Sequence, residues 1–166
     1  MTAPLLADRP SSLDHHDLVS LIRSVAENPA IWLPRVRFRD QERWWTRLHS
    51  DDRVDLWLIT WPVGTGTDLH DHGDSAAAFT VLDGRLDEVR PDPTTGELVV
   101  THLDASDHSI VEPGAVHDVR SPGPQRAVSI HAYSPPLSTM RFYEQAGSQL
   151  RITKTVDTDQ PEADPA

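Results

Sequence analysis

The sequence predicts an all-β domain, either a β-sandwich or a β-barrel, that follows one or two short N-terminal helices. Short runs with the alternation typical of β-strands recur from Val54 to Tyr133, and turn residues separate them. The chain also contains 14 prolines, which are placed more easily at turns and strand ends than inside helices. Both observations favour a fold built from many short strands.

Helices are predicted only near the N-terminus. Residues 14–28 carry an apolar stripe at helical spacing, made of Leu18, Leu21, Ile22 and Val25. Ser11, Ser12 or Asp14 can cap the start of this helix, and Pro29 follows its end. A second, shorter helix is predicted over residues 41–49.

From Val54 onward the spacing of apolar residues changes to two. Leu56, Leu58 and Thr60 alternate with Trp57, Ile59 and Trp61, which predicts a strand with both faces at least partly buried. Further strands are predicted over residues 77–82, 86–90, 98–103, 109–111, 116–120 and 127–133. Turns such as Asp83-Gly84 and Pro113-Gly114 lie between them.

A length of 166 residues corresponds to one domain, and neither a linker nor a repeat divides it. We expect residues 13–153 to form this domain. Residues 1–12 and 154–166 are polar and interrupted by prolines, so we expect them to be disordered tails.

The composition excludes several classes of protein. With 26 acidic and 15 basic residues the formal net charge is −11, which would repel nucleic acid, so we expect no nucleic-acid partner. No run of about 18 apolar residues occurs, so we expect no membrane span, and we expect no secretory signal. Cysteine is absent, which excludes disulfides and thiolate ligands. We therefore expect a cytoplasmic protein, and we expect a monomer.

The strongest indication of chemistry is a candidate metal site made of histidines. His70 and His72 point to the same face of a strand, because side chains repeat every two residues. His117 follows the Pro113-Gly114 turn, and an antiparallel return would bring it beside them. Three neutral imidazoles leave a divalent metal its full charge and open coordination positions. The alternative is a solvent-exposed pair in a loop, as most isolated His-x-His pairs are.

A second candidate constellation lies in the last predicted strand. Ser129, His131 and Tyr133 form a polar line, because they alternate with apolar residues. If this line faces the interior, its members must satisfy one another by hydrogen bonds, which would indicate a site. If it faces water, the strand is an ordinary outer strand. Periodicity alone favours neither.

Together these residues resemble the cysteine dioxygenase family of the cupin superfamily. The resemblance rests on His70-Asp-His72 with Asp74-Ser75, on His117, and on Ser129-x-His131-x-Tyr133-Ser-Pro-Pro. It covers about residues 14–150. Ala76 and Ala77 stand where many cupins have a glutamate ligand, which is itself the thiol dioxygenase pattern. The resemblance implies a cupin, a jelly-roll-like β-barrel.

The resemblance also implies an activity, which is oxidation of L-cysteine to cysteine sulfinic acid by O2 at Fe(II). It implies that His70, His72 and His117 hold the iron, and that Tyr133 acts in catalysis and substrate binding with support from His131 and Ser129.

Arg47, in Trp45-Thr46-Arg47, matches the family's carboxylate-binding arginine. Without the resemblance we would interpret Arg47 as a surface charge. Arg141 is a second candidate anchor, because it follows the turn Ser134-Pro-Pro.

Two departures from the family pattern leave the identity of the thiol open. Trp45 replaces the tyrosine of the arginine motif, and Ala77 stands where the mammalian enzymes carry a cysteine cross-linked to the active-site tyrosine. The alternatives are therefore a dioxygenase for 3-mercaptopropionate or another small thiol acid, a non-catalytic metal-binding cupin, and a hydrolytic or isomerising zinc cupin.

Overall fold

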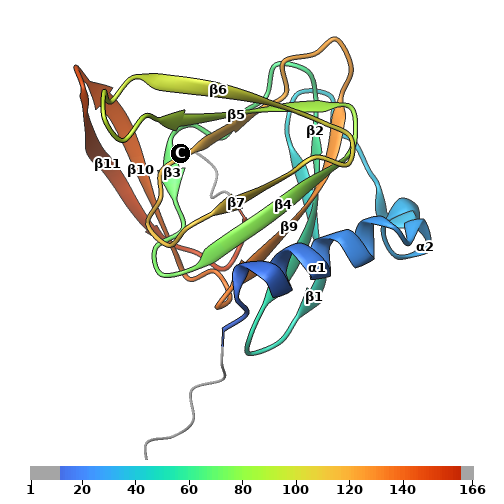
Figure 1. Ribbon diagram of the computed structural model, residues 1–166. Coiled ribbons are helices and arrows are strands. Elements are labelled where there is room, and N and C mark those ends of the chain that lie inside the picture. The colour runs from blue at the N-terminus through green and yellow to red at the C-terminus, as the bar shows by residue number, and fades with distance from the viewer. Residues whose placement is uncertain (1–11, 162–166) are drawn as a thin grey trace, which may run out of the picture.

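The computed structural model describes residues 12–161, and it consists of three antiparallel sheets around one interior (Figure 1). A five-stranded sheet has the order β1-β2-β9-β4-β7, and two three-stranded sheets have the orders β11-β10-β3 and β6-β5-β8. Two isolated bridges, Gly66 with Arg120 and His70 with His117, join the segment of residues 66–70 to the segment of residues 117–120. The all-β prediction is confirmed.

The strand bounds agree with most of the ranges predicted from the sequence. The strands are β1 (Trp44–Ser50), β2 (Asp55–Trp61), β3 (His70–Asp71), β4 (Ala76–Asp83), β5 (Arg85–Pro91), β6 (Leu98–Asp104), β7 (His108–Val111), β8 (Asp118–Arg120), β9 (Ala127–Ser134), β10 (Thr139–Ala146) and β11 (Gln149–Asp157).

The predicted N-terminal helix is present as α1 (His15–Ala26), and Asp14 caps it by accepting a hydrogen bond from the backbone N–H of Asp17. Pro29 follows this helix and also begins the short helix α2 (Pro29–Trp32). Helix α2 continues into a 3-10 turn, η1 (Leu33–Arg35). Within residues 12–161 no helix is long and apolar enough to cross a membrane.

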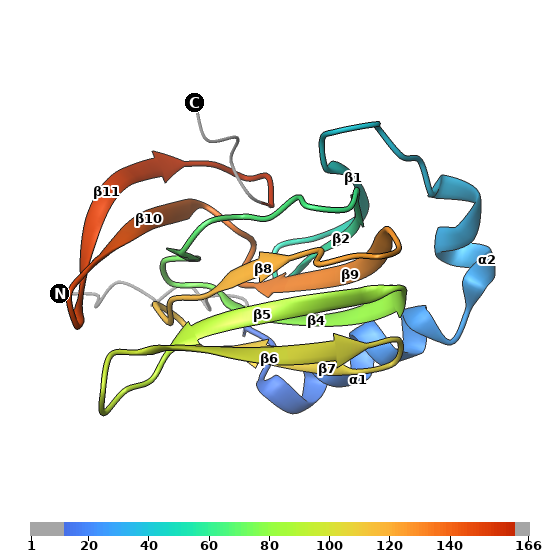
Figure 2. The same ribbon diagram turned by 90° about the horizontal axis from the view of Figure 1, so that it is seen from above.

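Helix α1 covers the outer face of the five-stranded sheet, so both faces of this sheet pack against apolar side chains. It lies along the outer side of β4 and β9 in both views (Figures 1 and 2), where Leu18 and Ile22 pack against residues such as Ile130. All residues of β2 are buried, which confirms the prediction for this strand. The inner face carries Trp57, Trp61 and their neighbours, and it closes the interior in which the site lies.

The prediction of a helix over residues 41–49 is wrong. This segment forms β1, which pairs with β2 from Trp44 opposite Thr60 to Ser50 opposite Asp55. Large aromatic and β-branched side chains such as Trp45 and Thr46 suit a pleated strand, and pairing along the edge of β2 outweighs the weak helical pattern.

The C-terminal boundary was also placed too early. Strand β11 extends to Asp157, because its residues pair with β10 as far as Thr139 opposite Asp157. Neither β10 nor β11 was predicted, since β11 is largely exposed and has little apolar content. The two form the curved ribbon at one side of the molecule in Figure 2. The expected tails otherwise lie largely outside the described residues.

Candidate metal centre

Three buried histidines meet in the interior, as the sequence predicted. His70 lies in β3, His72 follows it, and His117 immediately precedes β8. Their candidate ligand nitrogens lie within 4.8 Å of one another, and all three side chains are buried. The Nε2 atoms of His70 and His72 are 3.2 Å apart. The alternative of an exposed His-x-His pair is therefore excluded.

Backbone pairing holds His117 beside His70. The backbone N–H of His70 donates to the carbonyl of His117 at 2.8 Å, and that of His117 donates back at 2.9 Å. This bridge is the antiparallel return expected after the Pro113-Gly114 turn. Because the bridge directly joins the two backbones, the relative position of the two imidazoles does not depend on flexible loops.

Buried Asp71 holds in place the segment that carries His70 and His72. Its carboxylate accepts hydrogen bonds from the hydroxyl of Tyr143 at 2.5 Å and from the backbone N–H of Gly73 at 2.9 Å. It also forms an ion pair with Arg141, whose Nε lies 2.9 Å from Oδ2. These contacts tie β3 to β10 and so present His70 and His72 to the interior.

The hydrogen bonds of His70 and His117 determine which of their ring nitrogens carry protons. His70 Nδ1 lies 2.8 Å from the carbonyl oxygen of Asp68, and His117 Nδ1 lies 2.8 Å from Glu88 Oε1. A carbonyl and an ionised carboxylate only accept, so Nδ1 is the donor in both rings. In the neutral form of each ring the lone pair is therefore on Nε2, where it can bind a metal.

Glu88 is ionised although it is buried. Burial would raise the pKa of this carboxyl, but the hydrogen bond and charge of His117, with hydrogen bonds from Arg90 and Ser109, lower it to about 2. The Ser109 hydroxyl donates to Oε2 at 2.6 Å, and Arg90 donates to Oε1 at 2.8 Å. Glu88 thus orients His117 and makes its Nε2 a better donor to a metal.

The histidine triad fits a divalent metal. Burial, strengthened by the charges of neighbouring histidines, holds the pKa values of His70 and His72 well below their usual range, so both rings are neutral. Among the described residues, His117 Nε2 and His72 Nδ1 are buried without a hydrogen-bond partner. A buried polar nitrogen without a partner is costly, and a metal ion would satisfy His117 Nε2. Neutral imidazoles suit iron, zinc, nickel and copper.

The polar line of β9 faces the interior, which decides between the two orientations that periodicity left open. The Ser129 hydroxyl oxygen accepts a hydrogen bond from the indole N–H of Trp61 at 2.8 Å, and a second hydrogen bond, also of 2.8 Å, joins it to His131 Nε2. Burial, with the charges of His117 and Arg43, lowers the pKa of His131 to about 3, so this ring is neutral.

Tyr133 lies directly against the triad. Its ring centroid is 5.0 Å from that of His72, and its side chain is buried. Burial raises the pKa of its hydroxyl, so Tyr133 stays protonated at neutral pH and can donate a hydrogen bond. In the described part of the chain no hydrogen bond joins it to His131, whose ring centroid is 6.5 Å away. The expected chain from Ser129 therefore ends at His131.

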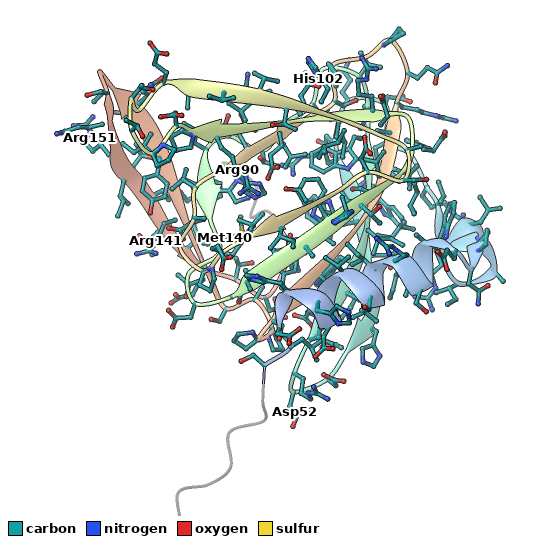
Figure 3. The ribbon with its side chains drawn as sticks, viewed as in Figure 1. Asp52, Arg90, His102, Met140, Arg141 and Arg151 are labelled. Atoms are coloured by element: carbon teal, nitrogen blue, oxygen red, sulfur yellow. The ribbon has the colours of Figure 1, made fainter. Side chains whose placement is uncertain are left out.

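The two candidate carboxylate anchors are both bound to acidic side chains. The guanidinium carbon of Arg47 lies 4.5 Å from the centroid of the Trp57 ring, and its Nη2 contacts the carboxylate of Asp159 at 3.3 Å. Its Nε also lies 3.7 Å from buried Asp55. Arg141, which Figure 3 marks on β10, is held by Asp71 as described above.

Comparison with known proteins decides the family. The family model for cysteine dioxygenase type I matches residues 8–146, most of the chain. The chain belongs to the cysteine dioxygenase type I family. Membership makes it an enzyme of the thiol dioxygenase class, and together with the triad it implies a bound metal.

Curated relatives agree with this assignment. Cysteine dioxygenase type 1 of Rattus norvegicus is 28% identical over 154 residues, covering 84% of this chain and 74% of the relative. The protein of the same name from Danio rerio is also 28% identical, covering 81% and 72%. Identity at this level supports the family and leaves the substrate to be argued from the site.

Solved structures show the same fold. A cupin superfamily protein from Desulfitobacterium hafniense matches with a TM-score of 0.55 at 17% identity, covering 65% of this chain and 91% of that chain. A protein with a double-stranded β-helix domain from Klebsiella pneumoniae matches with a TM-score of 0.53 at 19% identity, covering 72% and 90%. These matches confirm the cupin fold that the resemblance implied.

Two buried charged residues, one of which contacts the triad, were missed by sequence reasoning. Glu88 shares a strand face with Leu86, which is fully buried, and a carboxylate on a buried face was an available signal. Arg43 is also buried, with its guanidinium carbon 5.3 Å from the centroid of the Trp61 ring. Nothing in the spacing distinguished Arg43 from the other arginines of the segment.

Proposed function

We propose that the protein oxidises L-cysteine to cysteine sulfinic acid with O2, using Fe(II) held by His70, His72 and His117. The observation that carries this proposal is the buried triad of imidazoles, with a protonated tyrosine packed against it, in a member of the cysteine dioxygenase family. A ferrous ion supplies a site where a thiolate and dioxygen can meet. Both oxygen atoms of O2 are added to the thiol sulfur, which is oxidised as O2 is reduced, so no further reductant is needed.

The protein's own residues prepare this site for one small substrate. Neutral His70 and His72, and Glu88-supported His117, provide ligands without adding negative charge, so an anionic thiolate is not repelled by them. Orientation of two reactants in one site is a large part of the rate of such a reaction.

We assign Tyr133 the role of hydrogen-bond donor to the reacting groups. Its phenol stays protonated through burial, and its ring contacts that of His72. His131 and Ser129 support this wall of the site through the chain of hydrogen bonds that begins at Trp61. They act as positioning residues.

A second candidate substrate is 3-mercaptopropionate, which has the thiol and the carboxylate of cysteine but no amine. Trp45 weakens the case for cysteine, because this residue packs against the interior core where the family motif has a tyrosine. For the carboxylate of either substrate the family resemblance offers Arg47, which would have to exchange Asp159 for the substrate.

Oxygen uptake by the Fe(II)-loaded protein tests the proposal. L-Cysteine and 3-mercaptopropionate are supplied separately, and the sulfinate product is assayed. Uptake matched by cysteine sulfinate supports the proposal, whereas faster turnover of 3-mercaptopropionate keeps the chemistry and changes the substrate. No uptake with either compound, in protein shown to contain iron, would contradict it.

A further inference from the structure

Arg90 is the outer member of a chain of hydrogen bonds that ends at His117. His117 Nδ1 donates to Glu88 Oε1 at 2.8 Å, and Nη2 of Arg90 donates to the same oxygen atom, also at 2.8 Å. The carboxylate that receives both bonds is 4% exposed. A single oxygen atom therefore connects the charge of Arg90 to a residue of the histidine triad.

Strand alternation explains how Arg90 reaches this carboxylate. Leu86, Glu88 and Arg90 lie at every second position of β5, so they share one face of the strand. Leu86 and Glu88 are buried, which makes this the inner face. The Arg90 side chain extends from β5 toward β7 (Figure 3), where its Nη2 donates to Ser109 Oγ at 3.0 Å and to the carbonyl of Ile110 at 2.5 Å.

These contacts hold the guanidinium in place. The hydroxyl of Ser109 donates to Glu88 Oε2 at 2.6 Å, so Arg90, Ser109 and Glu88 form a closed set of hydrogen bonds that joins two strands. An exposed ion pair contributes little because its long side chains move. Arg90 is 35% exposed, but contacts on β5 and β7 keep its charge beside Glu88.

The charge of Arg90 matters because of what a carboxylate without a counter-charge would do. A carboxylate that accepts the Nδ1–H of a metal-binding histidine makes the ring more basic. Negative charge near a metal favours its higher oxidation state, and hydrogen bonds to its ligands adjust the reduction potential. Arg90 offsets the charge of Glu88, yet it leaves intact the hydrogen bond by which Glu88 orients His117.

We propose that Arg90 is a positioning residue that keeps iron at the histidine triad in the ferrous state. It acts through Glu88 and His117, and the inference rests on the proposed function because that function requires Fe(II). Without a thiol, transfer of one electron from Fe(II) to O2 leaves Fe(III) and superoxide. The positive charge of Arg90 disfavours this loss, because it destabilises the more highly charged ion.

Replacing Arg90 by glutamine should shift the balance toward Fe(III) by about 3- to 10-fold. Two hydrogen bonds and one imidazole ring separate the guanidinium from a metal on His117, so a unit charge acts at about 10 Å. At an effective dielectric constant of about 20 this corresponds to about 10- to 20-fold, and partial exposure of Arg90 reduces it. A 3- to 10-fold shift is a fall of about 30–60 mV in the one-electron reduction potential.

An anaerobic redox titration of the iron-loaded protein measures this potential, with the Fe(III) fraction followed by electron paramagnetic resonance. A second measurement is the rate at which ferrous protein is oxidised in air without a thiol, which should rise in Arg90→Gln. Arg90→Lys keeps the charge but loses the planar guanidinium, so it should recover most of the shift.

The controls separate the local charge from general effects. Arg85→Gln removes an exposed arginine of the same strand, which pairs with Asp104, and should leave the potential unchanged. Thermal unfolding and iron content show whether each variant is folded and loaded. Arg90→Met, which keeps an unbranched side chain, carries the test if Arg90→Gln does not fold.

Several results would overturn the assignment. An unchanged or higher potential in Arg90→Gln would contradict it, and an equal fall in Arg90→Lys would show that packing, and not charge, is responsible. Failure of both neutral variants to fold would make Arg90 structural. Failure of the proposed function is distinguishable, because iron-loaded wild type that takes up no oxygen with either thiol would refute that function, whereas the potentials would still test Arg90.

Discussion

Replacing Glu88 by glutamine should weaken binding of a divalent metal at the histidine triad by about 10- to 100-fold. Glu88 accepts the Nδ1–H of His117 at 2.8 Å, and both side chains are almost fully buried. Its carboxyl is ionised at neutral pH, since its pKa is lowered to about 2. Glutamine keeps the volume and one acceptor oxygen but removes the charge.

The expected loss of metal affinity follows from the hydrogen bond that glutamine keeps and the charge that it removes. A hydrogen bond to a charged group contributes about 1.5–3 kcal/mol, and a neutral one about 1 kcal/mol. The difference of about 0.5–2 kcal/mol acts on the basicity of His117 Nε2 and corresponds to a change in affinity of about 2- to 30-fold. The glutamine amide also meets Ser109 and Arg90, which now donate to a carboxylate, so the orientation of His117 is disturbed as well.

Competition with a chromophoric chelator under anaerobic conditions measures this affinity. Asp87→Asn is a matched control, because Asp87 is the adjacent residue of the same strand and bonds His102 at 2.7 Å, but at the surface. We expect wild-type affinity in the control and a loss only in Glu88→Gln. Equal affinity of Glu88→Gln and the wild type would refute the idea that Glu88 supports the metal ligand.

Three further substitutions test other parts of the site and fold. Tyr133→Phe should lower turnover by about 10- to 100-fold with near-normal iron content, because only a hydrogen-bond donor is lost; loss of iron would instead show a structural role. Ser129→Ala should destabilise the fold by about 2 kcal/mol in urea unfolding, because it leaves two buried polar partners unpaired; an unchanged midpoint would contradict this. Gly84→Ala should lower the melting temperature, because φ is +77° and an added Cβ would lie 2.5 Å from the carbonyl oxygen of Arg126; a rise would be the opposite of what the backbone predicts.

The parts of the fold that the sequence predicted are those with a strong local pattern. The seven strands from β2 to β9, with the exception of two-residue β3, carry alternating apolar residues between turn residues. Strand β1, which pairs with the next strand along the chain, was mistaken for a helix because its burial is incomplete and its apolar pattern is weak. Strands β10 and β11 pair mainly with each other, and much of their surface is polar, so periodicity carried little information about them.

The metal triad could be predicted because its spacing has a structural meaning. Two histidines at strand spacing and a third after a turn need only one antiparallel bridge to meet, and that bridge forms between His70 and His117. Their support could not be predicted in the same way. Asp71 accepts a hydrogen bond from Tyr143, which lies in β10, and Glu88, which lies in β5, accepts one from His117. Each contact therefore depends on how strands distant in sequence are placed.

Arg47 shows why a matched motif does not by itself assign a role. Arg47 occupies the position that the family resemblance indicates, yet it contacts the carboxylate of Asp159 and lies near that of Asp55. These acids come from another strand and from the segment after the last strand, and they offset the charge of Arg47 where it stands. Which arginine can bind a substrate carboxylate is therefore determined by neighbours that a motif of three consecutive residues does not contain.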